Sequence, residues 1–502
     1  MTYHGSGVLG DLHSCTGCTK DGTLETLGTT AGRGNEPRRW RRQFTCVGAA
    51  GLFVAFIAAG CAHYPVNAPV TQVNPQGGYR VRNVAPVENS KELFFLLAFS
   101  GGGTRAAAFS YGVLEAFRDI EVRLDGNKQR LLDEVDGISG VSGGSFTAAY
   151  YGLFGDRIFE DFESRFLNKD IQGALVSQTL FNPINWPRLF SPFFARSDLA
   201  AEYYDKQVFE GATFADLAAR KGPLIVINAT DMVHGTRISF AQDFFDAICS
   251  DLSRFPVARA CAASSAVPIV LTPITLRNHA GNCDYEIPEP VRRAMTARSG
   301  STRQLDLAND LRPFLDSEKK PYIHLVDGGV ADNLGLRAML ERVILAGDIW
   351  TTLRYSGQEN VRKVVFVLVN AETEVDTKWD RWESVPPFGA MLASYSSIGI
   401  ERYNVETVAL LRESIKGWTE EVQKNRCGQG PLSTEPGACG DIQFYVVEVR
   451  FDALEDPGER TYFKRLPTSF RLSPEEVDKL RDAARRILSG SKEFQRLLRD
   501  LQ

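Results

Sequence analysis

The sequence predicts an α/β protein in which helices cover a mostly parallel sheet. Short apolar, β-rich segments recur along residues 92–451, and helical patterns separate several of them. Several segments are continuously apolar rather than alternating, which is typical of strands buried on both faces. With 43% apolar and 24% charged residues, the composition is that of an ordinary globular protein.

The predicted elements begin with the run ELFFLLAF at 92–99, which we expect to be a strand. Residues 104–118 follow with helical spacing, and a short apolar segment at 135–141 precedes a helix that begins at Gly143. Ser473 and Pro474 start a C-terminal helix, because serine is a favoured N-cap and proline fits the first helical position. Further strands are expected at 223–229, 268–276, 322–327, 363–371 and 442–451, with helices over 333–347 and 388–416.

Four parts follow from this pattern. We expect a signal region at 1–60, an extended Pro-containing tether at 61–91 and a main domain at 92–345. Residues 346–502 form a C-terminal extension that is expected to complete the sheet and to add terminal helices.

The N-terminal region has the pattern of a secretory signal. Residues 43–60 carry no charge and follow four arginines within 38–42. The run ends Ala58-Ala59-Gly60-Cys61, which resembles a bacterial lipobox whose cysteine carries lipid. An uncleaved anchor remains an alternative, because a run of this length just reaches a membrane's thickness. We expect a lipoprotein of the bacterial envelope, with the outer membrane favoured because Ala62 follows Cys61.

The net charge of −5 argues against nucleic acid as the main partner, because phosphate neutralisation needs a basic surface. No motif indicates a metal site. The first glycine-rich loop is the one place where a cofactor, a dinucleotide, is considered.

That loop is Ser100-Gly101-Gly102-Gly103-Thr104-Arg105, placed between a predicted strand and a helix. Backbone amides at a helix N-terminus form an anion site. The loop fits a dinucleotide fingerprint, an oxyanion hole for acyl transfer, or a plain tight turn, and this segment alone does not separate them.

Two further motifs carry candidate chemistry. Gly140-Val141-Ser142-Gly143-Gly144 is a GxSxG pattern between a strand and a helix, the context of a nucleophile elbow. Asp327-Gly328-Gly329 ends a predicted strand, where open α/β sheets place their ligands, although a turn aspartate before glycine is also common.

The positions of the histidines bear on the base that would activate Ser142. No histidine follows His324, and His324 lies three residues before Asp327, so the two side chains are expected on opposite faces of a strand. His234 and His279 lie in no catalytic motif. The sequence therefore favours a nucleophile served directly by a carboxylate.

The order of glycine-rich loop, GxSGG and DGG resembles the patatin-like phospholipases over about residues 92–345. The block Ala263-Ser264-Ser265-Ala266-Val267-Pro268 is similar to that family's A-S-x-A-x-P block. The resemblance implies a three-layer α/β/α fold and a Ser–Asp dyad. It assigns Ser142 as nucleophile, Asp327 as general base and the amides of Gly101, Gly102 and Gly103 as oxyanion hole. Supporting positions are Thr104, Arg105, Gly140, Gly143, Gly144, Gly328 and Gly329.

The expected activity is hydrolysis of fatty-acyl esters, with phospholipid as the first substrate class. A non-catalytic envelope lipoprotein with this fold is the alternative, followed by a nucleotide-binding oxidoreductase. Residues 180–195 (LFNPINWPRLFSPFFA) are rich in aromatic side chains that could line an acyl pocket, touch a bilayer or pack in the core.

The remaining cysteines suggest an oxidising compartment. Cys427 and Cys439 flank a Gly/Pro-containing loop and are predicted to form a disulfide, with Cys249–Cys283 as a second candidate. Cys261 is expected to be a buried thiol.

Overall fold

The computed structural model describes residues 62–81, 83, 89–124, 126–268, 270–296, 301–374, 377–428 and 438–502. All of them lie in one compact unit, Phe56–Gln502. The predicted signal region at 1–60 and the lipidation site Cys61 lie outside the described residues. No helix in the described ranges is both long enough and apolar enough to cross a membrane.

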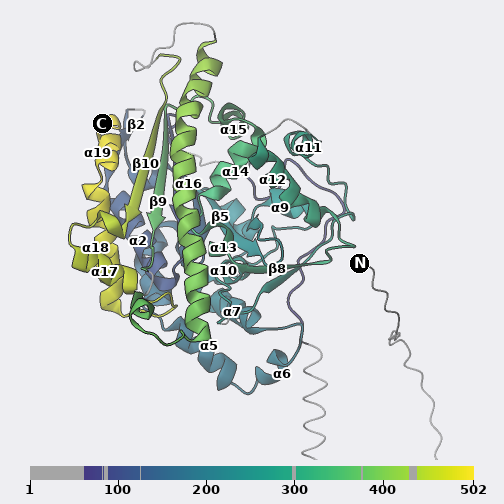
Figure 1. The fold of residues 1–502 in the computed structure, drawn as a ribbon. Coiled ribbons are helices and arrows are strands. Elements are labelled where there is room, and N and C mark those ends of the chain that lie inside the picture. Colours follow the sequence, from purple (N-terminus) through teal and green to yellow (C-terminus); the bar gives the residue numbers. More distant parts are fainter. Residues whose placement is uncertain are drawn as a thin grey trace, which may run out of the picture. The chain divides into compact units, whose positions relative to one another are not determined.

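An eight-stranded mixed sheet forms the centre of this unit, in the order β10-β9-β1-β4-β5-β8-β7, with β6 also paired to β5 (Figure 1). The strands from β10 to β5 in that order are parallel, whereas β8, β7 and β6 run antiparallel to their neighbours. The predicted mostly parallel sheet is thus confirmed. The strands are β1 Leu93–Phe99, β4 Val135–Val141, β5 Leu224–Asp231, β6 Arg237–Ser239, β7 Ile274–Arg277, β8 Tyr322–Asp327, β9 Lys363–Asn370 and β10 Gln443–Arg450, and a separate hairpin pairs β2 Glu121–Leu124 with β3 Asn127–Arg130.

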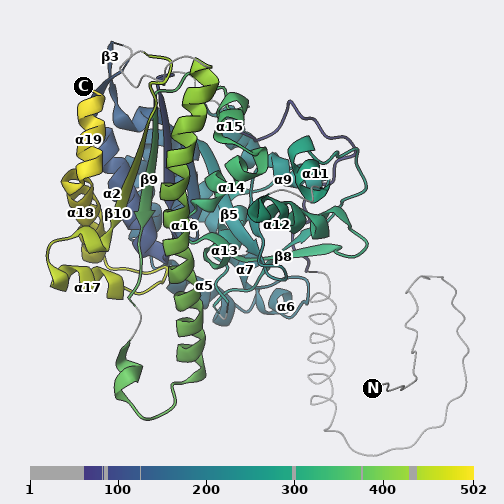
Figure 2. The same ribbon diagram turned by 45° about the horizontal axis from the view of Figure 1, so that its top comes forward.

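Helices cover both faces of the sheet, because alternate side chains of each buried strand point to opposite faces. On β1, Phe95 and Leu97 enter a core shared with α2, α3 and α18, whereas Ala98 enters a core shared with α14, α15 and α16. Figures 1 and 2 show α16 crossing one face while α2 and α18 lie on the other. The three-layer α/β/α arrangement is confirmed.

The helix bounds follow the predicted pattern with local differences; the 40-residue α16, for example, continues past the predicted end at 416. The α-helices are α2 Gly103–Asp119, α3 Gly143–Phe154, α4 Ile158–Phe162, α5 Ile171–Leu180, α6 Trp186–Leu189, α7 Arg196–Tyr204, α8 Phe214–Ala219, α9 Gln242–Ala247, α10 Val257–Ser264, α11 Glu289–Thr296, α12 Thr302–Leu311, α13 Gly329–Asp332, α14 Arg337–Ala346, α15 Ile349–Tyr355, α16 Phe388–Cys427, α17 Pro457–Arg465, α18 Pro474–Gly490 and α19 Lys492–Asp500.

One predicted strand is much shorter than expected. Of the segment 268–276, only the part from Ile274 onward joins the sheet, as β7. Pro268 and Pro273 explain the difference, because proline has no N–H to donate to a neighbouring strand.

Residues 62–81, within the predicted extended tether at 61–91, pack on the domain. Tyr79 is buried, and its hydroxyl accepts a hydrogen bond from the Ile225 amide at 2.7 Å. Arg80 is buried too and pairs with Asp246 at 2.7 Å and with Asp243 at 2.9 Å. An aromatic side chain and a paired arginine thus hold this segment on the domain.

Both candidate cysteine pairs are bonded in the structure. Cys249 and Cys283 have Cα atoms 5.6 Å apart, and the Cα atoms of Cys427 and Cys439 are 5.3 Å apart. The second bond joins the end of α16 to the segment that enters β10. Cys261 is a free, buried thiol whose pKa is raised by burial.

Candidate active site

Ser142 occupies a sharp turn between β4 and α3. Its φ of 48° lies in the left-handed region, which is strained for a residue with a side chain. The following residue must be glycine, because a Cβ on Gly143 would lie 1.9 Å from the Gly103 carbonyl oxygen. A Cβ on Gly140 would lie 2.7 Å from the Ser145 Cα, and a Cβ on Gly144 would lie 2.6 Å from the Ser100 carbonyl oxygen. The turn has the geometry by which a nucleophile elbow presents its hydroxyl.

Asp327 lies at the end of β8 beside this turn. Its carboxylate accepts the Gly329 N–H at 2.8 Å, and the neighbouring Ser142 side chain lowers its pKa in opposition to burial. Burial raises the pKa of Asp327 to about 6. A buried carboxylate with a raised pKa that lies beside a serine turn has the proton affinity of a general base.

The sheet register explains why these two residues meet. Val141 pairs with Asn228 on β5, and Asp327 pairs with the next residue, Ala229. The sequence argument placed Asp327 at the carboxyl end of a sheet strand, and Asp327 is the last residue of β8. Strand β8 is antiparallel to β5 and ends level with the end of β4.

Ser264 supports both catalytic candidates, a role that the sequence reasoning missed. Its hydroxyl accepts the Ser142 N–H at 2.8 Å and donates to the Asn228 carbonyl at 2.6 Å. Its backbone carbonyl accepts the Gly328 N–H at 3.0 Å. The A-S-x-A-x-P block therefore joins the nucleophile turn to the base loop, and the resemblance of this block was the only sequence signal for it.

The loop Gly101–Gly103 lies against Ser142, but its three amides are not equivalent. A Cβ on Gly101 would be 3.4 Å from the Ser142 Cβ. The Gly101 N–H donates to the Asn333 carbonyl at 3.0 Å, so it is already engaged and does not fit the predicted oxyanion role. In the part of the chain that the structure describes, the amides of Gly102 and Gly103 have no acceptor. These two amides remain available to a developing negative charge.

Thr104 and Arg105 connect the same loop to the C-terminal extension. The Thr104 N–H donates to the Ser469 carbonyl at 2.9 Å. The buried Arg105 guanidinium donates to the Ala371 carbonyl at 3.2 Å, to the Thr468 hydroxyl at 3.1 Å and to the Leu466 carbonyl. Burial lowers the pKa of Arg105 to about 10. Arg105 thus holds the loop in place, and none of these hydrogen bonds is made to Ser142.

The dinucleotide interpretation of this loop does not fit the hydrogen bonds at the start of α2. The Thr104 N–H, in the first turn of that helix, donates to the Ser469 carbonyl at 2.9 Å, so this amide is not available to a pyrophosphate.

His234, His279 and His324 have other partners. His234 contacts Asp231 at 3.0 Å, His279 contacts the Asn67 carbonyl at 3.1 Å, and His324 contacts Thr275 at 3.0 Å. These contacts place none of the three rings on the Ser142 hydroxyl, which agrees with a carboxylate base.

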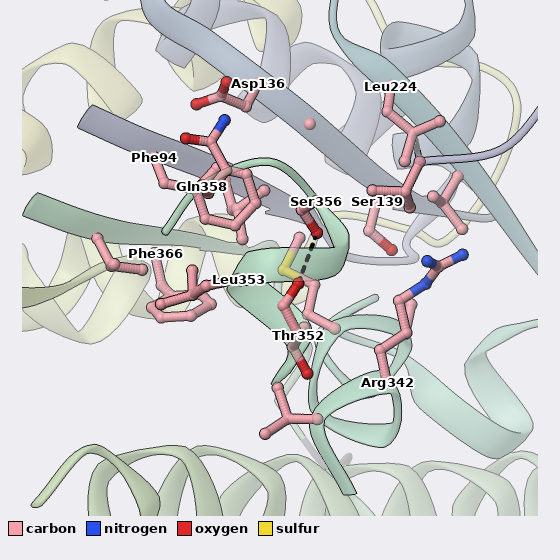
Figure 3. Close-up of a pocket in the computed structure, with 18 of the residues that line it drawn as sticks. Phe94, Asp136, Ser139, Leu224, Arg342, Thr352, Leu353, Ser356, Gln358 and Phe366 are labelled. Carbon is pink, nitrogen blue, oxygen red and sulfur yellow. Dashed lines mark hydrogen bonds between the residues drawn. The ribbon is translucent and has the colours of Figure 1, made fainter. Parts of the chain in front are cut away.

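A mostly apolar cavity of about 130 Å³ lies elsewhere, between the sheet and α14–α16 (Figure 3). Phe94 and Phe366 border it, and Ser139 and Asp136 of β4 supply polar groups. Burial raises the pKa of Asp136 to about 7. Neither Ser142 nor Asp327 lines this cavity, so it is separate from the candidate active site.

A strained serine, a buried carboxylate and two unoccupied amides are the groups that acyl transfer requires. Fold and site together therefore define an α/β protein with a serine–carboxylate pair. Residues 97–340 match the family model described as patatin-like phospholipase, so the chain contains a domain of that family.

Solved structures similar to this chain include human GIVD cytosolic phospholipase A2, at 13% identity and a TM-score of 0.42, covering 82% of this chain and 60% of that one. The same human enzyme in complex with methyl gamma-linolenyl fluorophosphonate matches at 14% identity and a TM-score of 0.37, covering 82% and 59% of the two chains. This chain thus spans about 60% of the length of the first structure. No curated protein matches it.

Proposed function

We propose that this protein is a serine acyl hydrolase that cleaves fatty-acyl esters of lipids through a Ser142–Asp327 dyad. The observation that carries the proposal is the position of the buried Asp327 carboxylate beside the Ser142 turn, which adjacent register positions on β5 fix and which the effect of the Ser142 side chain on the Asp327 pKa reflects. The strained turn at Ser142 and the open amides beside it support the same chemistry.

In the proposed reaction Asp327 takes the proton of the Ser142 hydroxyl as its oxygen bonds to the ester carbonyl carbon. The amides of Gly102 and Gly103 stabilise the oxyanion. The intermediate then expels the alcohol or lysolipid, which takes a proton from Asp327. Water, deprotonated by Asp327, attacks the acyl-enzyme, and the fatty acid leaves as the proton returns to Ser142.

Phospholipid glycerol esters are the proposed substrates, presented by a membrane. The proposed cellular setting is the bacterial envelope, with a lipid anchor on Cys61 and the outer membrane favoured. The two disulfides support an oxidising compartment, because such bonds are rare in reducing cytosol.

Labelling by a fluorophosphonate tests the nucleophile directly. The unsubstituted protein should be labelled and should release fatty acid from phospholipid, and Ser142→Ala should do neither while keeping its thermal stability. Ser110→Ala is a matched control, because Ser110 is buried in α2 and its hydroxyl has no recorded partner.

Retention of full esterase activity by Ser142→Ala would show that another residue is the nucleophile. A well-folded protein that neither reacts with the label nor hydrolyses any lipid would instead favour the non-catalytic lipoprotein.

A further inference from the structure

Six large apolar side chains are exposed together in the segment that spans the end of α5, α6 and the loop before α7. Phe190 is 82% exposed and Phe181 is 76% exposed, so ordinary core packing, one of the three expectations for 180–195, is wrong for most of the segment. Only Phe194 of its phenylalanines is buried. The aromatic patch, as we name it, consists of Leu180, Phe181, Ile184, Trp186, Phe190 and Phe193. Patches of this kind in soluble proteins mark interaction sites.

The segment that carries the aromatic patch is almost uncharged. Between Ile171 and Ala195 the only charged residue is Arg188. Its guanidinium pairs with Glu202 and lies over the Phe194 ring at 4.1 Å. Transfer of the patch into an apolar medium would therefore desolvate almost no unpaired charge, which is the main cost of inserting protein into lipid.

The start of the described chain lies on the aromatic patch. The Ala62 carbonyl accepts the Ser191 hydroxyl at 2.6 Å, and the Tyr64 N–H donates to the Phe193 carbonyl at 2.7 Å. The His63 ring stacks on Phe193 with 5.3 Å between centroids. Cys61, the predicted lipidation site, is covalently next to Ala62, and the uncharged run 43–60 precedes it. Ala62, the residue that follows the predicted lipidation site in the sequence, is thus in contact with the segment that carries the patch.

The aromatic patch is also linked to the candidate active site. The Ile171 and Gln172 amides, at the start of α5, donate to the Phe470 carbonyl at 3.1 and 3.2 Å. The adjacent Ser469 carbonyl accepts the Thr104 N–H beside the oxyanion loop. Figure 1 shows α5 and α6 at the end of the sheet toward which the β9 arrow points. Ser142 follows β4, which runs parallel to β9 through β1, and so lies at that same end.

We infer that the aromatic patch inserts into the surface of a phospholipid bilayer and holds the Ser142 end of the sheet against it. The inference rests on the proposed function for its biological purpose, although insertion itself requires no catalysis. Because the patch is apolar and nearly uncharged, insertion should occur in zwitterionic membranes and should change little with salt.

Trp186 supplies a native reporter of insertion. The full chain in the Ser142→Ala background is incorporated into phosphatidylcholine vesicles, with lipids brominated on their acyl chains as quenchers of tryptophan fluorescence. We expect strong quenching that Trp186→Phe removes in large part. Trp350→Phe is the matched control, because Trp350 lies on α15, away from α5 and α6 in both views of the fold (Figure 2).

A second pair of variants tests the whole patch. Phe190→Asp places a charge in its centre and should reduce the quenching of Trp186 several-fold. Val405→Asp is the control, because Val405 is 63% exposed on α16 outside the patch and its variant should be quenched like the parent.

If Trp186→Phe and Trp350→Phe reduced the quenching equally, the inference would be overturned. The same holds if Phe190→Asp were quenched as strongly as the parent. A dimer that Phe190→Asp converts to a monomer, without any lipid quenching of Trp186, would assign the patch to self-association instead. Fluorophosphonate labelling of the active chain is measured separately, so quenching without labelling would reject only the proposed function.

Discussion

At the scale of single residues, both members of the proposed dyad are held in states that cost folding energy. Ser142 has a backbone conformation that disfavours side chains, and Asp327 is buried where its charged form is poorly solvated. Such costs are common at catalytic groups, because backbone strain and burial of charge raise reactivity and also lower the stability of the folded state.

Asp327→Asn should abolish hydrolysis and stabilise the protein at neutral pH. The folded-state pKa of Asp327, about 6, lies above the ordinary 3.8, so folding favours the protonated carboxyl. The carboxyl's contribution to stability is thus fully present below pH 3.8 and is lost as the pH rises to about 6, a loss of about 3 kcal/mol. Asparagine does not titrate, so the variant should gain most in stability above pH 6. Denaturant unfolding at about pH 8 and about pH 4 measures the difference.

The hydrolytic activity of the unsubstituted protein should rise as the pH passes through about 6, because Asp327 then loses its proton and can act as a base. Its stability changes with pH in the opposite direction. The prediction would be contradicted if Asp327→Asn and the parent differed in stability by the same amount at every pH. Asp327 would then not be a buried carboxyl that titrates in this range.

Ser264→Ala should lower kcat about tenfold with little change in KM, because it leaves the Ser142 N–H without its acceptor and loosens the nucleophile turn. Ser265→Ala is the control. Ser265 is the adjacent buried serine, and its hydroxyl bonds to the Cys261 carbonyl at 2.8 Å. Steady-state hydrolysis of a soluble ester compares the two, and equal effects would reduce Ser264 to a general packing residue.

The two turns that carry Ser142 and Asp327 could be predicted at this scale because their motifs encode local backbone geometry. Gly143 and Gly328 each occupy a position where a Cβ would meet backbone, and the sequence carries that requirement directly. The engagement of the Gly101 amide could not be predicted, since its acceptor is the carbonyl of the distant Asn333 and any residue type supplies a carbonyl.

At the scale of elements, buried strands were predictable and their directions were not. The runs that became β1 and β9 are continuously apolar, which indicates burial on both faces. The run that became β8 has a similar apolar content, and nothing in it distinguishes an antiparallel strand from a parallel one. Yet this direction brings Asp327 to Ser142.

The disulfide between Cys427 and Cys439 should stabilise the junction of α16 and β10. It closes a short loop, with a sequence separation of 12, and cross-links of this size contribute about 3 kcal/mol. The double variant Cys427→Ser/Cys439→Ser should melt several degrees lower than the parent and should lose part of its sensitivity to reductant.

The parent protein with and without reductant gives the reference for that measurement, and Cys261→Ala controls for the loss of a cysteine elsewhere. Identical melting of the double variant and the parent would mean that this bond contributes nothing to stability.

At the scale of the whole molecule, the C-terminal extension is part of the domain. Strand β9 pairs with β1 from Leu93 to Phe99, and α18 packs on α2 within the same core. The three acceptors of Arg105 all lie beyond residue 370. The patatin-like region and the extension thus share one core.

A chain that ends at residue 345 should therefore fail to fold. Its β1 edge would be unpaired and both helical layers would lose their partners. Near-ultraviolet circular dichroism and solubility of fragments 62–345 and 62–502 test this expectation. A soluble shorter fragment that unfolds cooperatively would show that the region 92–345 is autonomous.

The exposure of the aromatic patch could not be predicted from the composition. The sequence contains 31 phenylalanines, and their number does not tell which of them are buried and which are exposed. The packing of residues 62–81 on the domain was hidden for a related reason, since it depends on partners such as Asp246 that lie far along the chain.

The left-handed backbone at Ser142 has a consequence for how such a protein would change over generations. Glycine would relieve the strain there, and a neutral residue would relieve the burial of charge at Asp327. A lineage released from selection for hydrolysis would thus gain robustness by losing these two side chains first, while the glycines packed around them would persist. Inactive descendants should keep the turn and lack the hydroxyl.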